Sequence, residues 1–158
     1  MGSCCRDSGC ETSPLVGMAE TCPECGQKGK RVSTLTVKSL VKEHTRVASD
    51  DYFFCRTPAC AVVYFSQRGL FQKDDVKARV GLKETEDPIP LCYCFEYSRG
   101  NIRSDIESKG STDIVERIKG EVKAGYCACE VKNPSGDCCL GDVTRAVQEA
   151  TRALAAKA

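Results

Sequence analysis

The first half of the chain carries strand-like patterns of apolar and polar residues. In residues 31–41, and again in residues 76–82, the side chains alternate in the manner of a β-strand. The segments YFFC at 52–55 and AVVYF at 61–65 are rich in residues that favour strands. These patterns predict a small antiparallel β-sheet.

The second half has the apolar spacing of helices. Ile102 and Ile106 lie four residues apart, in a helix that should begin near Ser98. Gly110 is expected to end this helix, because glycine readily adopts the left-handed conformation found after a helix C-terminus.

Two more helices are expected after Gly110. The first should begin at Ser111 or Asp113 and end at Gly125. Its apolar face is formed by Ile114, Ile118 and Val122. Asp142 is expected to cap the last helix, whose alanine-rich end should fray. If the first two helices of this half are antiparallel, they return the chain to its starting point.

The prolines and acidic residues of ETEDPIP, residues 84–90, mark a boundary because they favour an extended connector. We therefore predict an α+β fold with three parts: a flexible, cysteine-containing lead-in at residues 1–20, a zinc-binding β domain at 21–87, and a helical [2Fe–2S]-binding domain at 88–158.

Composition directs attention to cysteine, which occupies 13 of 158 positions. Units this small bury little surface and commonly need a disulfide or a metal as a staple. No signal peptide is visible, and the longest apolar run, Ala61 to Phe65, is too short to span a membrane. We therefore expect a cytoplasmic protein with reduced thiols, where clustered cysteines favour metal sites. The net charge of +1 gives no indication of nucleic-acid binding.

Four cysteines of the first half have the spacing of a zinc site. Cys22 and Cys25 form a Cys-x-x-Cys pair, and Cys55 and Cys60 form a second pair thirty residues later. Two such thiolate pairs can close a tetrahedral Zn²⁺ site, whose role would be structural because no coordination position stays open.

A thioredoxin-like redox role for Cys22 and Cys25 is the alternative. The segment GQKGKR that follows predicts a turn, however, and the redox motif requires the start of a helix. The single histidine, His44, lies in a polar connection, and we expect it at the surface.

Six further cysteines lie in two groups with no histidine near them. They are Cys92, Cys94, Cys127, Cys129, Cys138 and Cys139. A site built from thiolates alone suits zinc, Cu⁺ or an iron–sulfur cluster. The two predicted helices between the groups would bring them together.

Several segments resemble a known family. CYCF and CACEVKNPSGDCCLGD are similar to the [2Fe–2S] domain of bacterioferritin-associated ferredoxin. They are more similar still to the amino-terminal half of the CopZ copper chaperones, which carries zinc and a [2Fe–2S] cluster. CPEC, YFFCRTPACAVVYF and RVGLKE resemble the zinc part of that same half, so that the resemblance covers residues 21–150.

This resemblance implies ligands for both metal groups. For Zn²⁺ it implies Cys22, Cys25, Cys55 and Cys60. For the [2Fe–2S] cluster it implies Cys92, Cys94, Cys129 and Cys139. Cys127 and Cys138 remain rivals of the last two. Cys139 is favoured because it precedes Leu140 and a predicted helix, whose free amides and dipole stabilise an anion.

CopZ chaperones continue into a copper domain with a Met-x-Cys-x-x-Cys loop, which this sequence does not contain. Copper delivery is therefore not implied by that domain. The remaining candidates for binding Cu⁺ as a third metal are Cys4, Cys5 and Cys10 in CCRDSGC.

Together these features predict an iron–sulfur and zinc protein of copper handling. It would transfer single electrons and reduce Cu²⁺ to Cu⁺ for a metal-handling partner, such as a copper chaperone domain or a transporter. One alternative is a thiol-based module that binds or delivers Cu⁺ or Hg²⁺ without redox chemistry. Another is a structural domain that docks a partner. No hydrolase or nucleotide-binding motif indicates an enzyme.

Overall fold

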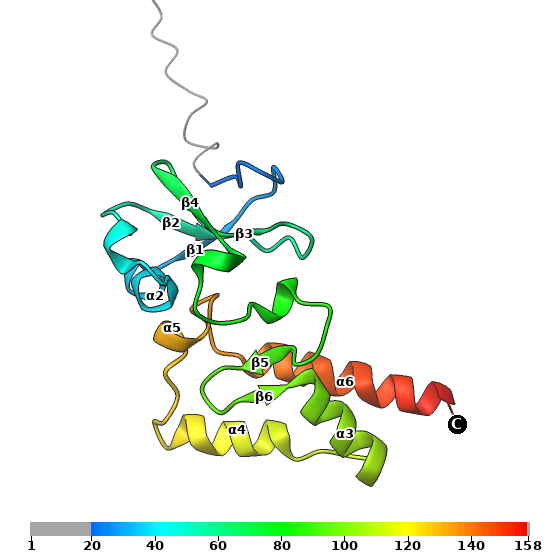
Figure 1. Ribbon diagram of the computed structural model, residues 1–158. Coiled ribbons are helices and arrows are strands. Elements are labelled where there is room, and N and C mark those ends of the chain that lie inside the picture. The colour runs from blue at the N-terminus through cyan, green and yellow to red at the C-terminus, as the bar shows by residue number, and fades with distance from the viewer. Residues whose placement is uncertain (1–19, 158) are drawn as a thin grey trace, which may run out of the picture.

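The computed structural model of the chain describes residues 20–157. Its first part holds a four-stranded antiparallel sheet of order β1-β2-β3-β4 (Figure 1). The strands are β1 (Lys30–Val32), β2 (Tyr52–Phe54), β3 (Val62–Ser66) and β4 (Gly69–Gln72). The predicted α+β class is confirmed, as are the strands predicted within residues 52–55 and 61–65.

The strand predicted for residues 31–41 is wrong beyond Val32. Helix α2 (Thr34–Leu40) takes its place, and the Ser33 hydroxyl caps it by accepting a hydrogen bond from the Thr36 amide at 3.1 Å. Its buried residues are Thr36, Val37 and Leu40. This spacing is helical, so packing against the sheet outweighs the preference of β-branched residues for strands.

The strand predicted for residues 76–82 is also wrong. Two short 3-10 turns, η2 (Lys73–Asp75) and η3 (Gly81–Lys83), lie at the ends of an irregular segment. Strand alternation would bury Leu82, yet Leu82 is 48% exposed, and the neighbouring Lys83 is only 5% exposed. The hydrogen bonds of Lys83, described below, account for this reversal.

Both faces of the sheet are covered. Tyr52 and Phe54 of β2 point into a core shared with α2, whereas Phe53 points into a second cluster on the opposite face. In that second cluster the rings of Phe53 and Phe65 stack with their centroids 5.6 Å apart. The predicted zinc ligands lie on this face, where Cys22, Cys55 and Cys60 are buried in the same cluster as these two rings and Cys25 is half-buried beside them.

The second part is mainly helical. Its elements are β5 (Pro90–Cys92), β6 (Tyr97–Ser98), α3 (Arg99–Lys109), α4 (Ile114–Lys123), α5 (Cys129–Lys132) and α6 (Leu140–Lys157). Ser98 caps α3, and Gly110 ends it with a φ of 77°, as predicted. Helix α4 begins after Asp113, and Gly125 follows it with a φ of 85°, also as predicted.

The last helix departs from prediction at its start. It begins at Leu140, and Asp142 lies within its first turn rather than before it. The reason is that the Cys139 carbonyl accepts a helical hydrogen bond from the Val143 amide at 3.0 Å. The helix continues to Lys157, so the end expected to fray is helical in the structure. Helices α3 and α4 both pack against α6, and their isoleucines form the core of this part.

The two parts meet where the loop after α5 lies against the sheet. In Figure 1, α5 lies directly below α2, between the sheet and the lower helices. The buried Tyr64 hydroxyl of β3 donates to the Pro134 carbonyl at 2.5 Å. Lys30 of β1 donates to the Ser135 carbonyl at 2.7 Å and pairs with Asp137. The boundary near residue 87 stays a prediction.

No helix within residues 20–157 is both long enough and apolar enough to cross a membrane.

Candidate metal centres

The four cysteines of the first part converge. The sulfurs of Cys22, Cys25, Cys55 and Cys60 all lie within 4.8 Å of one another. Cys22 and Cys60 are 3.9 Å apart, and Cys25 and Cys55 are 3.7 Å apart. A tetrahedron of Zn–S bonds of about 2.3 Å places its sulfurs about 3.8 Å apart. The group therefore fits Zn²⁺.

Local turns present these thiols. The Cys22 carbonyl accepts a hydrogen bond from the Gly26 amide at 2.9 Å, and Gly26 has a φ of 73° that favours glycine. The other two ligands flank the β2–β3 connection, because Cys55 follows β2 and Cys60 precedes β3. The turn itself lies at residues 23–25, and the segment predicted as a turn, residues 26–31, is irregular before it enters β1 at Lys30. The helix that a thioredoxin-like pair requires does not follow Cys25.

The thiols differ in acidity. The Thr57 hydroxyl, 3.2 Å from the Cys25 sulfur, is the main cause that lowers the pKa of Cys25 to about 6. Burial raises the pKa of Cys60 to about 12 and also raises the pKa of Cys22. In the metal-free chain Cys25 is therefore the first of these three to ionise, and a bound cation is needed to hold the buried ones as thiolates.

His44 is exposed in the 3-10 turn η1 (His44–Arg46), which confirms its interpretation as a surface residue. Cys4, Cys5 and Cys10, the candidates for an additional soft-metal site, lie outside the described residues.

The cysteines of the second part form close pairs. The sulfurs of Cys94 and Cys129 are 3.5 Å apart. Cys92 and Cys139 share a hydrogen bond, which is the main cause that lowers the pKa of Cys92 to about 6. The same contact, together with burial, raises the pKa of Cys139. The four cysteines predicted as cluster ligands thus form two pairs, and a hydrogen bond from the Cys139 amide to Cys129 links one pair to the other.

Backbone amides point at these sulfurs. The Ala128 amide donates to the Cys94 sulfur at 3.2 Å. Amides of Phe95 and Cys94 also lower the pKa of Cys92. Burial raises the pKa of Cys129 to about 12, although the Cys139 amide acts in the opposite direction. Such donors are what a thiolate-bound anionic centre requires.

The two rival cysteines have different surroundings. Cys127 and Cys138 are both exposed, whereas Cys92 is 0% and Cys139 is 2% exposed. The geometry therefore favours the ligand set given by Cys92, Cys94, Cys129 and Cys139, which stays a prediction.

Comparison with known proteins identifies the family. A CopZ family described as "Zinc binding domain" matches residues 19–77. The crystal structure of the N-terminal domain of CopZ from Archaeoglobus fulgidus superposes with a TM-score of 0.67 and 39% sequence identity, covering 79% of this chain and 95% of that domain. The chain belongs to the CopZ N-terminal domain family. The resemblance to CopZ noted in the sequence is thereby confirmed.

The copper chaperone CopZ of the same organism is 42% identical over 119 residues, which are 75% of this chain and 57% of CopZ. The chain therefore matches little more than half the length of that CopZ. Similarity to bacterioferritin-associated ferredoxin stays a prediction, as does the cluster itself.

Sequence reasoning missed the polar residues that support the CopZ-like cysteine loops. Thr57 contacts the Cys25 sulfur, and the buried Lys83 donates to carbonyls of the Cys55–Cys60 loop. Tyr93 lies between two predicted cluster ligands and bonds to residues 79 and 81. No local pattern marks these residues, because their partners are distant in sequence.

Proposed function

We propose that this chain is the zinc- and [2Fe–2S]-binding module of a copper-handling protein. Cys22, Cys25, Cys55 and Cys60 would hold Zn²⁺, and Cys92, Cys94, Cys129 and Cys139 would hold the cluster. When bound, such a cluster supplies one-electron transfer, which is the chemistry that converts Cu²⁺ to Cu⁺. The partner would be a copper-handling protein, such as a chaperone domain or a transporter.

A structural role for Zn²⁺ follows from the closed ligand set. Four thiols occupy all four tetrahedral positions and leave none for a substrate. The site joins the segment before β1 to the β2–β3 connection, so its metal would fasten the sheet that carries Tyr64 and Lys30. Zinc would therefore contribute folding free energy rather than catalysis.

The observation that carries the cluster proposal is that four of the six thiols are paired and buried or half-buried, whereas the other two are exposed. A [2Fe–2S] centre has two irons, and each takes two protein ligands. The described structure offers two close pairs of buried or half-buried thiols, supported by amides, and it leaves Cys127 and Cys138 exposed. Burial of Cys92 and Cys139 shields that side of the site from water, while Cys94 and Cys129 lie nearer the surface.

The exposed thiols favour a second candidate function. Cys127 and Cys138 are accessible to a soft metal ion, so this chain can also act as a thiol-based module that binds or delivers Cu⁺ without electron transfer. Replacing Cys4, Cys5 and Cys10 by serine, and separately replacing Cys127 and Cys138, tests this function. Loss of Cu⁺ binding with an unchanged visible spectrum would favour it.

The main test uses the full chain purified without oxygen. We expect about two irons and two sulfides per chain, together with one zinc, and a visible spectrum that bleaches on reduction. The reduced chain is then titrated with Cu²⁺ in the presence of a Cu⁺-specific chelator. Recovery of the oxidised spectrum in step with Cu⁺ formation supports electron transfer. If the chain is coloured but its reduced form is not reoxidised by Cu²⁺, the redox proposal is wrong, while the proposed metal sites are unaffected.

A further inference from the structure

Lys83 is a buried cation whose surroundings are unusual. Its side chain is 5% exposed, and its ammonium donates to the Thr57 carbonyl at 2.8 Å and to the Cys60 carbonyl at 3.0 Å. Within residues 20–157 no carboxylate lies within ion-pair distance of this ammonium. A buried charge normally requires an opposite charge or a full set of hydrogen bonds.

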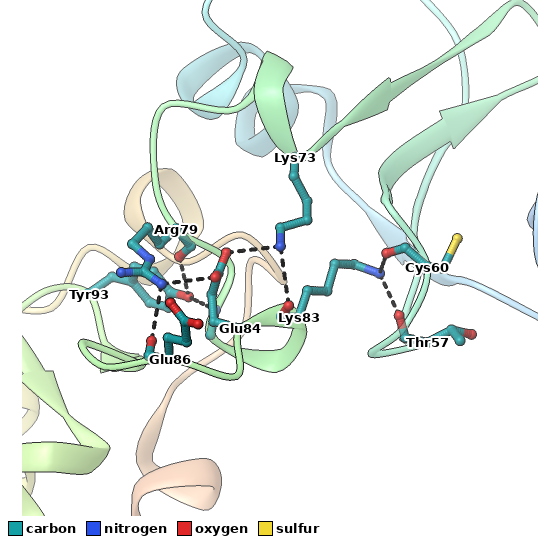
Figure 2. A network of polar contacts seen from close by, with 9 residues as sticks. Thr57, Cys60, Lys73, Arg79, Lys83, Glu84, Glu86 and Tyr93 are labelled. Atoms are coloured by element: carbon teal, nitrogen blue, oxygen red, sulfur yellow. Dashed lines mark hydrogen bonds and ion pairs between the residues drawn. The ribbon is translucent and has the colours of Figure 1, made fainter.

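The opposite charge is available from the four-cysteine group. Four thiolates around one Zn²⁺ carry a net charge of −2, and Lys83 bonds to the carbonyl of one of these cysteines, Cys60. Figure 2 shows the ammonium reaching across to the Thr57–Cys60 loop. Lys83 therefore fixes the loop that presents Cys60, and it places a positive charge on the backbone of that loop.

The same segment also holds the loop of the second centre. Tyr93, between Cys92 and Cys94, donates its hydroxyl hydrogen to the Arg79 carbonyl at 2.9 Å and accepts a bond from the Gly81 amide at 2.9 Å. Gly81 packs directly on strand β5, because a Cβ at this position would lie 1.9 Å from the Pro90 carbonyl oxygen.

Ion pairs make this segment rigid. Glu84 pairs with Lys73 at 3.2 Å and with Arg79 at 2.9 Å, and its side chain is largely buried. The Arg79 hydrogen bond is the main cause that holds the pKa of Glu84 below its usual value. Lys73 of η2 also donates to the Lys83 carbonyl, so the end of this segment at residues 83–84 is tied to the turn that follows β4, and Arg79 is tied to that end through Glu84 (Figure 2).

We propose that residues 79–84 are a positioning element shared by the two metal centres. Lys83 supports the zinc loop, and Arg79 and Gly81 support Tyr93 of the cluster loop. The inference rests on the proposed function, since it takes Zn²⁺ and the cluster as the occupants. Its consequence is that loosening one metal loop weakens the retention of metal in the other.

The first test measures zinc release to a chromogenic chelator from the full chain. We expect Lys83→Met to release zinc about tenfold faster than wild type, as for the loss of other groups that support metal ligands. Lys83→Gln keeps hydrogen-bond donors without the charge and should also release zinc faster. The control is Lys77→Met, because Lys77 also donates to a carbonyl, that of Ser39, but is exposed. Wild-type release rates in both Lys83 variants would overturn the inference.

The second test measures iron release. It uses no Lys83 variant, so it remains valid even if those variants do not fold. Removing zinc from the wild-type chain should accelerate iron release. In Tyr93→Phe, iron release should already be fast, and zinc removal should accelerate it less than in wild type, because the link is broken. If removing zinc leaves the rate of iron release from the wild-type chain unchanged, the shared role is refuted.

The metal content of the wild-type chain distinguishes failure of the proposed function from failure of the shared positioning role. A wild-type chain without zinc or iron would overturn the proposed function and this inference together. A chain that holds both metals, but in which they leave independently, would overturn this inference alone.

Discussion

At the scale of single residues, hydrogen bonding and burial give chemically similar thiols different properties. Cys25 is made acidic by a threonine hydroxyl, whereas Cys60 is made less acidic by burial, although their sulfurs belong to one group. In the second part, Cys127 and Cys138 each lie within two residues of a buried or half-buried thiol yet are exposed. A metal site is thus specified by the surroundings of each sulfur as much as by the spacing of cysteines.

The acidity of Cys25 depends on Thr57. Replacing Thr57 by valine removes the hydroxyl, so the pKa of Cys25 in the metal-free chain should rise from about 6 toward its ordinary value of 9.0. Because the folded pKa lies below the ordinary value, ionised Cys25 stabilises the metal-free fold at high pH, and this contribution disappears as the pH falls through about 6. Alkylation of Cys25 as a function of pH, followed by peptide mass spectrometry, measures the shift. Thr57→Ser should keep the low value.

The choice among the six thiols of the second part is testable by serine substitution. Cys129→Ser and Cys139→Ser should lose most of the bound iron, because each removes one member of a close pair. Cys127→Ser and Cys138→Ser should keep it, because both side chains are exposed. Iron and sulfide content with the visible spectrum decides the matter. Retention of iron in Cys129→Ser together with its loss in Cys127→Ser would reverse the assignment.

At the scale of elements, local signals located helices α3, α4 and α6 and strands β2 and β3, whereas tertiary contacts decided α2 and the segment of residues 76–82. Ser98 and Gly110 were predicted as the limits of α3 because a cap and a left-handed glycine act on their own backbone. The residues of α2 favour strands, and besides the Ser33 cap it is the burial of Val37 and Leu40 against the sheet that makes the segment helical. The burial of these two residues cannot be predicted from the sequence of the segment alone.

The residues of the candidate sites also fall into two classes, those that the sequence reveals and those that only the tertiary structure reveals. The pairs Cys22 with Cys25 and Cys55 with Cys60 could be found because their spacing is a property of the sequence. Lys83 could not, since its burial depends on carbonyls more than twenty residues earlier in the chain, and strand alternation placed it on the solvent side.

The close packing of η3 on β5 has a measurable energy. Gly81→Ala would place a Cβ 1.9 Å from the Pro90 carbonyl oxygen, so it should lower the free energy of unfolding by about 1–3 kcal/mol or more. Gly120→Ala is the matched control, because a Cβ there meets no atom within 4 Å. In helix α4 this alanine should raise the free energy of unfolding by about 0.5–1 kcal/mol. Urea denaturation gives both values, and equal effects of the two changes would contradict the packing argument.

At the scale of the whole molecule, the sheet acts as a support for the loop between Cys129 and Cys139. The Tyr64 hydroxyl and the Lys30 ammonium bond to carbonyls of this loop. Gly136 lies so near α2 that a Cβ would meet the Thr36 hydroxyl at 3.1 Å. The first part therefore supports the loop between Cys129 and Cys139 from one side, and we propose that residues 79–84 support the Cys92–Cys94 loop from another.

Tyr64→Phe tests this support. It removes a buried hydrogen bond and leaves the Pro134 carbonyl without its donor, which should cost about 1–3 kcal/mol of stability and accelerate iron release. Tyr52→Phe is the control, since the Tyr52 hydroxyl accepts a bond from the Ala48 amide within the first part. It should cost similar stability without changing iron release. Chemical denaturation and iron transfer to a chelator are the measurements. Equal iron release from the two variants would show that the loop does not depend on Tyr64.

If zinc stabilises the sheet as proposed, the contact between the Pro134 loop and the sheet would also set an order of maturation. A newly synthesised chain that has not taken up zinc would then hold this surface less stably. For a chain that acquires both metals as proposed, the binding site for iron and sulfide would be complete only after zinc has bound. Zinc supply would then limit how much of this protein can be charged with iron, even in a cell that has iron in plenty.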